Sequence, residues 1–134
     1  MGLKYVLDTD ICIYIMNKTH DSVFKHLNKT SSGEVAMSII TYGELLNGAN
    51  KSDFHQRAIQ KLALLTEIIP PLSLPVEVVQ HYGKIRSLLE KKGKIIGGND
   101  LWIAAHALSL DVTLVTNNGK EFKRIAALKV ENWC

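Results

Sequence analysis

Short apolar runs alternate along this chain with longer segments in which apolar residues recur at helical spacing. The short runs predict strands at residues 4–7, 34–38, 67–69 and 113–116. The longer segments predict helices at residues 11–16, 21–28, 39–49, 55–65, 76–92 and 99–110, and a short helix starting at residue 121. Strands that alternate with helices favour right-handed crossovers and parallel pairing. We therefore expect an α/β fold, a three-layer α/β/α sandwich with a central, mainly parallel sheet.

Length and hydrophobicity predict one folded unit. The chain has 134 residues, of which 46% are hydrophobic, enough for one core but too few for two ordinary domains. We expect a single domain over residues 1–134. No apolar stretch reaches the roughly 18 residues that a membrane helix needs, and the first residues lack the layout of a signal peptide. We therefore expect a cytoplasmic protein with no membrane partner. Cys12 and Cys134 form neither a CxxC pair nor a zinc pattern and are expected to be free thiols.

Three acidic residues lie far apart in the sequence, each where an apolar run meets a predicted helix. Asp8 follows the first strand, Glu44 lies in the helix after the second, and Asp100 follows a glycine-rich turn. In an open parallel sheet, ligands bind beyond the carboxyl ends of the strands, so these residues can meet at one edge. Carboxylates brought together repel one another unless a cation neutralises them, and Mg²⁺ prefers such oxygen ligands. The pattern indicates metal-dependent phosphate chemistry.

Each acid also has a purely structural interpretation. Asp8 can cap the helix that follows it. Glu44 stands three residues after Thr41, the spacing of a capping box. Asn99 or Asp100 can cap the helix after Gly97 and Gly98. Three separate caps do not explain why an apolar strand leads directly into Asp8, or why a double-glycine turn precedes Asp100. We therefore favour one site that contains all three acids.

Other polar and aromatic residues have simpler interpretations. His106 has no second histidine four residues away, so we interpret it as a packed helix residue and not as a metal ligand. Trp102 and Trp133 are expected in the core or an interface. Asp10 is expected to cap a helix or to orient residues of the site without binding the ion itself.

The formal net charge of +3 is too small to indicate a nucleic-acid partner by itself. Basic residues nevertheless gather before Asp100 and after Asn117, where they could hold phosphates beside the expected site, although such clusters are most often solvated faces. They are Lys84, Arg86, Lys91, Lys92, Lys94, Lys120, Lys123 and Arg124.

Four motifs, in order, carry a resemblance to a known family. They are Leu-Asp-Thr-Asp at 7–10, Ser-Ile-Ile-Thr-Tyr-Gly-Glu-Leu at 38–45, Gly-Gly-Asn-Asp at 97–100 with Ile-Ala-Ala-His-Ala at 103–107, and Val-Thr-Asn-Asn at 115–118 followed by Glu-Phe. With these motifs, the chain resembles PIN-domain ribonucleases of the VapC toxin type over nearly its whole length. The four-part match is more specific than any one motif.

The resemblance implies a function and a set of partners. It implies a PIN-like sandwich that acts as an endoribonuclease and depends on Mg²⁺, with Mn²⁺ as a substitute. It also implies that the enzyme is a homodimer and that a VapB-type antitoxin inhibits it. Such toxins cut structured RNA and arrest growth by stopping translation, and the favoured substrate is tRNA, in particular the anticodon stem-loop of initiator tRNA. DNA is expected as a partner only indirectly, through the antitoxin.

The resemblance also implies roles for particular residues. Asp8, Glu44 and Asp100 match the acidic metal-site residues of the family, while a fourth acidic position of many PIN domains is Asn117 in this sequence. Asp8 and Asp100 would hold the ion, and Glu44 would bind it or position the attacking water. Asn117 could offer a neutral oxygen, and Glu121 could supply the missing charge. The supporting residues expected are Thr9, Thr116, Asn117 and Glu121.

Two other functions remain open at the level of sequence. The Asp8-Thr9-Asp10 motif after a strand is similar to that of aspartate-nucleophile phosphatases, which would make Asp10 essential, although Cys12 stands where those enzymes usually have Thr or Val. A catalytically inactive PIN-like module that binds RNA or protein is the second alternative, because Asn117 replaces an acid.

Overall fold

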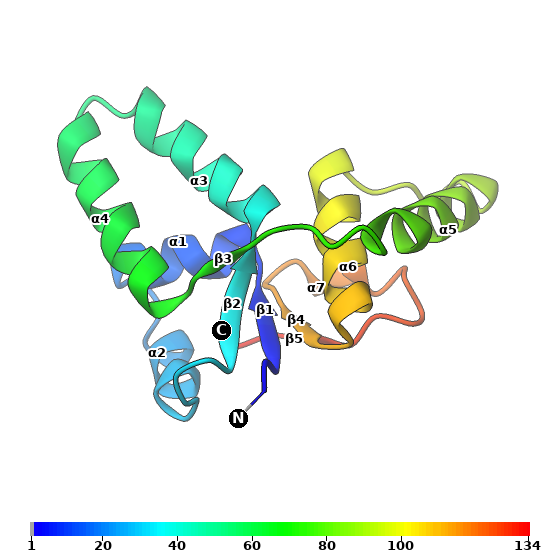
Figure 1. Cartoon of the computed structure of the whole chain (residues 1–134), viewed down its shortest axis with the longest axis horizontal. Coiled ribbons are helices and arrows are strands. Elements are labelled where there is room, and N and C mark those ends of the chain that lie inside the picture. The colour runs from blue at the N-terminus through cyan, green and yellow to red at the C-terminus, as the bar shows by residue number, and fades with distance from the viewer. Residues whose placement is uncertain (1) are drawn as a thin grey trace.

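The computed structural model describes residues 2–134 and has a parallel sheet between two layers of helices (Figure 1). The strands are β1 (Tyr5–Leu7), β2 (Val35–Ser38), β3 (Pro71–Leu72), β4 (Thr113–Val115) and β5 (Val130–Glu131). All the strand pairs are parallel, and the order across the sheet is β3-β2-β1-β4-β5. The helices are α1 (Thr9–Asn17), α2 (Asp21–Asn28), α3 (Ile39–Lys51), α4 (His55–Ile68), α5 (Val78–Lys91), α6 (Gly98–Leu110) and α7 (Gly119–Phe122). The expected α/β/α sandwich is confirmed.

Side chains of the central strands alternate between two apolar cores. Val6 and Leu114 face the core that includes α5, α6 and α7, whereas Leu7 and Val115 face the core that includes α1, α2 and α4. Neighbouring residues of a strand point to opposite faces, so a sheet covered on both faces needs the continuous apolar runs that this sequence has. Figure 1 shows α3 and α4 on one side of the sheet and α5 and α6 on the other.

The strand predicted at residues 67–69 is wrong. Residues 67 and 68 are the last residues of α4, and the N–H of Ile69 still donates to the carbonyl of Leu65 at 2.8 Å. The third strand is Pro71–Leu72, which pairs with β2 at the edge of the sheet. An edge strand tolerates a proline because it needs fewer N–H donors. A short apolar run at the end of a helix has the same pattern as a buried strand, and burial of Leu62, Leu65 and Ile69 extends the helix instead.

Other element ends differ slightly from the predicted ones. α5 begins at Val78, because Pro75 first starts a turn in which the N–H of Val78 donates to its carbonyl at 3.0 Å. Gly93 adopts a φ of +64° just beyond the end of α5, as expected for a glycine that stops a helix. The strand β5 was not assigned from the sequence.

The aromatic and cysteine predictions are largely confirmed. Trp133 is buried, with its ring edge-on to Tyr5 at a centroid distance of 5.2 Å, and Trp102 stacks on Tyr82 at 3.7 Å. Cys12 and Cys134 are both free thiols, one buried and one exposed. Among the helices of residues 2–134, none is both long and apolar enough to span a membrane.

Candidate active site

The candidate residues come together at the carboxyl edge of the sheet. Asp8 directly follows β1, Thr116 directly follows β4, and α3, which carries Glu44, directly follows β2. Asp100 lies in the first turn of α6. Parallel strands end at the same edge, so the order β2-β1-β4 brings these segments together.

Asp8 is held by two hydrogen bonds in a buried position. Its Oδ1 accepts from the backbone N–H of Thr9 at 2.8 Å, and its Oδ2 accepts from the hydroxyl of Thr116 at 2.8 Å. Asp8 is the N-cap of α1, so the capping interpretation is correct and does not exclude a second role. Burial, followed by the charge of Asp10, raises the pKa of Asp8 to about 6, although the bonds from Thr116 and Thr9 oppose the shift.

Glu44 does not form the capping box that its spacing suggests. The N-cap of α3 is Ser38, whose Oγ accepts from the N–H of Ile40 at 3.2 Å, so Thr41 lies inside the helix. Glu44 instead points toward α1, where its Oε1 accepts from the hydroxyl of Thr9 at 2.6 Å. Thr9 therefore connects the segment after β1 to Glu44.

Asp100 is also not a cap, since Gly97 is the N-cap of α6 and the helix begins at Gly98. Burial, followed by the charges of Asp8 and Glu121, raises the pKa of Asp100 to about 7.

Glu121 is the fourth acid of this edge. Its Oε1 accepts from the N–H of Gly97 at 3.2 Å, and its Oε2 accepts from the amide of Asn118 at 2.7 Å. Chiefly because of the Asn118 bond, the pKa of Glu121 is lowered, so this side chain remains charged beside Asp100. The sequence does not indicate either residue as a partner of Glu121. Gly97 lies 24 positions away, and the contact with Asn118 depends on the side-chain rotamer.

Both polar atoms of the Asn117 side chain are hydrogen-bonded to residues outside the acidic group. Its Oδ1 accepts from the amide of Asn132 at 3.0 Å, and its Nδ2 donates to the hydroxyl of Tyr14 at 3.2 Å. Its backbone N–H donates to Asp10 at 3.0 Å, and the other oxygen of Asp10 accepts from Ile11 at 2.7 Å. Asp10 is not the cap of α1, because the N-cap is Asp8, but its carboxylate joins the first turn of α1 to the segment after β4. The amide oxygen of Asn117 is already hydrogen-bonded.

The chemistry of this donor set fits a hard divalent cation. Within residues 2–134, no three His, Cys, Asp or Glu side chains converge closely enough to hold an ion as they stand. The charges of the acids at this edge nevertheless interact, because those of Asp8 and Glu44 both contribute to the raised pKa of Asp100. Carboxylate oxygens are the ligands that Mg²⁺ and Mn²⁺ prefer, and a cation would relieve this repulsion.

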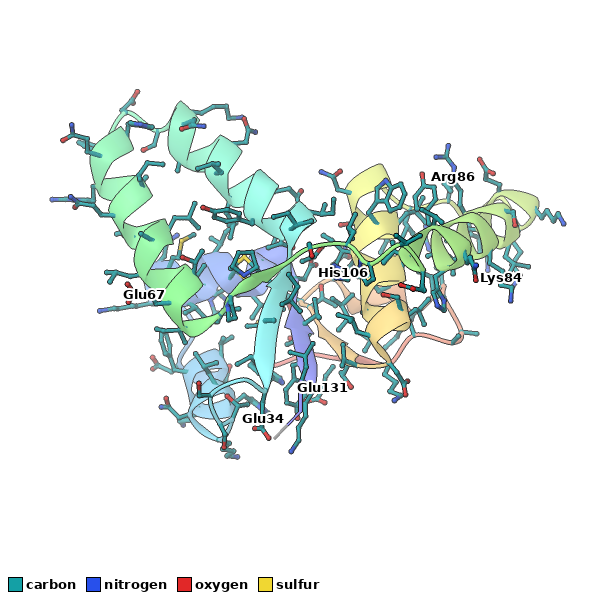
Figure 2. The ribbon with its side chains drawn as sticks, viewed as in Figure 1. Glu34, Glu67, Lys84, Arg86, His106 and Glu131 are labelled. Carbon is teal, nitrogen blue, oxygen red and sulfur yellow. The ribbon has the colours of Figure 1, made fainter. Side chains whose placement is uncertain are left out.

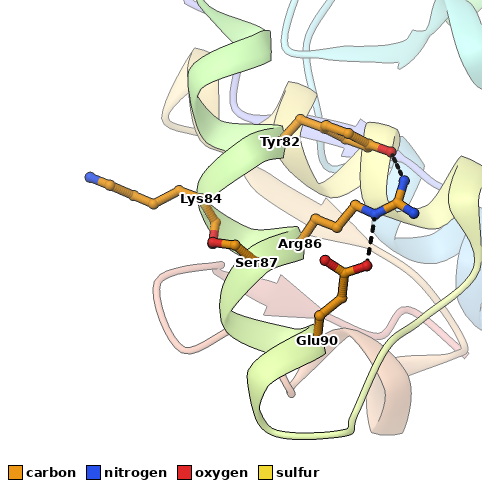
Figure 3. Close-up of polar contacts among 5 residues, drawn as sticks. All are labelled: Tyr82, Lys84, Arg86, Ser87 and Glu90. Carbon is orange, nitrogen blue, oxygen red and sulfur yellow. Dashed lines mark hydrogen bonds and ion pairs between the residues drawn. The ribbon is translucent and has the colours of Figure 1, made fainter.

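The basic residues before Asp100 have different environments. The guanidinium of Arg86 donates to the hydroxyl of Tyr82 at 2.6 Å and to Glu90 at 3.4 Å, while Lys84 points away from this group (Figure 3). The guanidinium of Arg124 donates to the carbonyl of Ile95 at 3.2 Å. Arg86 is therefore engaged by two side chains of its own helix, and Lys84 takes no part in that cluster.

A cavity of about 450 Å³ adjoins the acidic edge on the side of α1, α3 and α4. Thr9 and Glu44 line it together with the apolar residues Ile13 and Leu45 and the exposed Phe54. The remaining lining residues are Met16, Asn17, Gly48, Ala49, Ser52, Arg57, Ala58 and Lys61. A groove lined by both apolar and polar residues thus leads directly to Glu44.

Comparison with known proteins agrees with the fold and the motifs. The PIN domain family model matches residues 5–128. Ribonuclease VapC1 of Haemophilus influenzae is 42% identical over 130 residues, covering 96% of this chain and 97% of the relative. The tRNA(fMet)-specific endonuclease VapC of Shigella flexneri is 35% identical over 131 residues, covering 98% of each chain.

A solved structure gives the same result in three dimensions. VapBC2 of Rickettsia felis bound to a DNA fragment from its promoter contains a chain with 40% identity and a TM-score of 0.92, covering 98% of this chain and 100% of that one. The parallel sandwich, the order of the motifs and these matches agree. The chain therefore belongs to the PIN-domain family and, within it, to the VapC ribonucleases.

Proposed function

We propose that this chain, as one PIN domain over residues 1–134, is a metal-dependent endoribonuclease toxin of a toxin-antitoxin pair. The observation that carries the proposal is the group of acids at the carboxyl edge of the sheet. Asp8 and Asp100 have raised pKa values there, and Glu44 accepts a hydrogen bond from the hydroxyl of Thr9 in α1. Such crowding of acids is costly without a cation, which supports a functional site over three helix caps. The names of the VapC relatives support the same activity.

Asp8, Glu44 and Asp100 would hold Mg²⁺, or Mn²⁺ in its place. When bound there, the cation supplies positive charge that lowers the pKa of a water molecule and stabilises charge developing on a phosphodiester. The chain's own residues orient the acids: the hydroxyl of Thr116 and the N–H of Thr9 hold Asp8, and the hydroxyl of Thr9 holds Glu44. Glu121 adds negative charge beside Asp100. No histidine is needed as a base.

The proposed substrate is structured RNA, with tRNA favoured and the anticodon stem-loop of initiator tRNA as the specific candidate. The name of the Shigella flexneri relative, at 35% identity, supports this choice. Cutting that RNA in the cytoplasm would arrest translation. Phosphate contacts from lysines beside the site would position the RNA backbone without reading its sequence.

The proposed partner is a VapB-type antitoxin that occupies the groove beside Glu44. The groove has an apolar lining from Ile13 and Leu45, next to the exposed ring of Phe54. A groove between helices that has both apolar and charged lining residues suits an amphipathic segment of a partner. The related structure from Rickettsia felis is a VapBC complex on promoter DNA, which supports an antitoxin partner and an indirect contact with DNA. We also propose that the toxin forms a homodimer.

The test is cleavage of a bulk tRNA pool by the purified chain, freed from antitoxin, in Mg²⁺ or Mn²⁺ and in EDTA. Asp8→Ala and Glu44→Ala are compared with Asp53→Ala, which removes an exposed carboxylate elsewhere. Discrete metal-dependent cuts that only the first two variants lose are expected, and sequencing of the product ends locates them. Intact tRNA with a folded, metal-bound wild type would refute the tRNA assignment.

The same samples separate the two alternative functions. A phosphatase would turn over phosphomonoesters and need Asp10, whereas both oxygens of Asp10 are engaged by backbone N–H groups. An inactive binding module would retain RNA equally well in wild type and Asp8→Ala, and neither would cut it.

A further inference from the structure

The helices that carry Glu44 and Asp100 are joined by a hydrogen bond remote from the carboxylates. Nδ1 of His106 on α6 lies 2.8 Å from Oγ of Ser38, and both residues have no exposed surface. Ser38 is the last residue of β2 and the N-cap of α3. Figure 2 shows His106 on the side of α6 that faces the sheet. The contact therefore ties α6 to the start of α3.

The hydrogen-bonding groups indicate where the protons lie. Oγ of Ser38 already accepts from the N–H of Ile40, so its hydroxyl hydrogen is available to donate to Nδ1 of His106. The ring then carries its proton on Nε2, which has no hydrogen-bond partner within residues 2–134. The reverse arrangement would leave both the Ser38 hydroxyl hydrogen and the Nε2 lone pair without partners. Burial lowers the pKa of His106, although a contact with the backbone of Ser73 opposes the shift, and the net effect favours the neutral ring.

Packing alone does not account for an imidazole at this position. A buried polar atom without a partner costs about 1–3 kcal/mol, and an aliphatic side chain would fill the space without that cost. The surrounding residues of α6 are apolar, since Ile103, Ala104, Ala105 and Ala107 are all fully buried. The hydrogen bond to Ser38 is therefore a contact that an imidazole can make at this position and a leucine cannot.

We propose that His106 is a positioning residue which, through Ser38, fixes the start of α3 against α6 and so sets Glu44 relative to Asp100. This inference rests on the proposed carboxylate site. Glu44 is six residues after Ser38 and Asp100 is six residues before His106, about 9 Å along each helix at 1.5 Å per residue. A shift of the contact is therefore transmitted to both acids, and displacements of about 1 Å are enough to impair catalysis.

Four variants of the full chain test the proposal. His106→Phe fills the space without an acceptor, Ser38→Ala removes the donor, and His106→Asn places an amide oxygen near the position of Nδ1. Ser109→Ala is the matched control, because it removes a hydrogen bond of 2.7 Å to the carbonyl of His106 on the same helix without touching α3. The measurements are Mn²⁺ affinity by calorimetry, kcat and KM for tRNA cleavage, and the midpoint of thermal unfolding.

In His106→Phe and Ser38→Ala, Mn²⁺ affinity and kcat are expected to fall about 10- to 100-fold, the usual effect of losing a residue that orients ligands. The KM for RNA should stay within about threefold, because phosphate contacts are not altered. His106→Asn should recover most of the loss, and Ser109→Ala should match wild type. In ¹⁵N spectra of wild type, Nδ1 should have the shift of an unprotonated nitrogen.

Several results would overturn the inference. Wild-type Mn²⁺ affinity in folded His106→Phe would do so, as would equal losses in His106→Asn and His106→Phe. A purely structural role would lower the unfolding midpoint while leaving Mn²⁺ affinity unchanged at temperatures where the variants are folded. If wild type binds Mn²⁺ but cuts no RNA, the proposed function fails while the affinity series still tests His106. Absence of Mn²⁺ binding in wild type would overturn both.

Discussion

Removing the charge of Asp8 should stabilise the metal-free protein even though it destroys the proposed site. Asp8 is 5% exposed, and burial is the main reason that its pKa rises from 3.8 to about 6. A shift of about two pKa units costs about 3 kcal/mol of stability at neutral pH. Asp8→Asn removes this cost but replaces one carboxylate oxygen with an amide nitrogen. That nitrogen cannot accept the hydrogen bond from Thr116 or Thr9, a loss of about 1–2 kcal/mol. The net gain expected is about 1–2 kcal/mol.

The sign of this effect depends on pH. Well below pH 3.8 the carboxyl is protonated in both the folded and the unfolded chain, so it imposes no penalty. Between about pH 4 and 6 the unfolded chain loses the proton while the folded chain keeps it, so the free energy of unfolding falls as the pH rises. Asp8→Asn should therefore have little advantage at pH 4 and its full advantage at pH 7.5.

The assay is urea and thermal unfolding followed by circular dichroism in EDTA at both pH values, with Asp53→Asn as an exposed-carboxylate control. At pH 7.5 the unfolding midpoint of Asp8→Asn should exceed that of wild type by roughly 3–8 °C for a domain of this size. Adding Mn²⁺ should raise the midpoint of wild type and reverse the order, since only wild type retains the full ligand set. An Asp8→Asn variant that is less stable than wild type in EDTA at both pH values would refute the reasoning.

Three further predictions concern neighbouring residues. Thr9→Val removes the hydroxyl that holds Glu44 at 2.6 Å, so kcat should fall about 10- to 100-fold while Thr9→Ser stays near wild type; equal rates in cleavage assays would contradict this. Glu121→Gln should weaken Mn²⁺ binding more than Asn117→Ala does, because the Asn117 amide bonds to Tyr14 and Asn132; calorimetry decides between them. Ile13→Glu should reduce antitoxin retention in co-purification without altering RNA cleavage, whereas the control Leu64→Glu, exposed but absent from the groove lining, should retain the antitoxin.

Much of the fold follows from local pattern. The run before Asp8 and the run at 113–116 are apolar on both faces, which a parallel sheet between two helical layers requires. The error at residues 67–69 has the same origin, because two or three apolar residues do not distinguish a strand from the end of a helix. The packing of Ile69 and the pairing of Pro71 with Met37, neither visible in the sequence, decide that segment.

The candidate site depends more on tertiary structure. The spacing of Thr41 and Glu44 satisfies a capping box, yet Ser38 caps the helix and Glu44 bonds to Thr9. Whether a glutamate three residues after a threonine caps a helix or faces another segment depends on where the helix starts. One residue of difference in the start rotates the side chain by about 100° around the axis.

The order of residues along the chain is enough to indicate which side chains could do the chemistry and roughly where each would lie, since acids directly after apolar strands fall at one edge of a parallel sheet. Tertiary structure alone decided the partners: Thr116 with Asp8, Gly97 with Glu121, and His106 with Ser38. These contacts join residues separated by up to 108 positions. They depend on strand register and helix packing, which follow from the whole core and not from any local pattern.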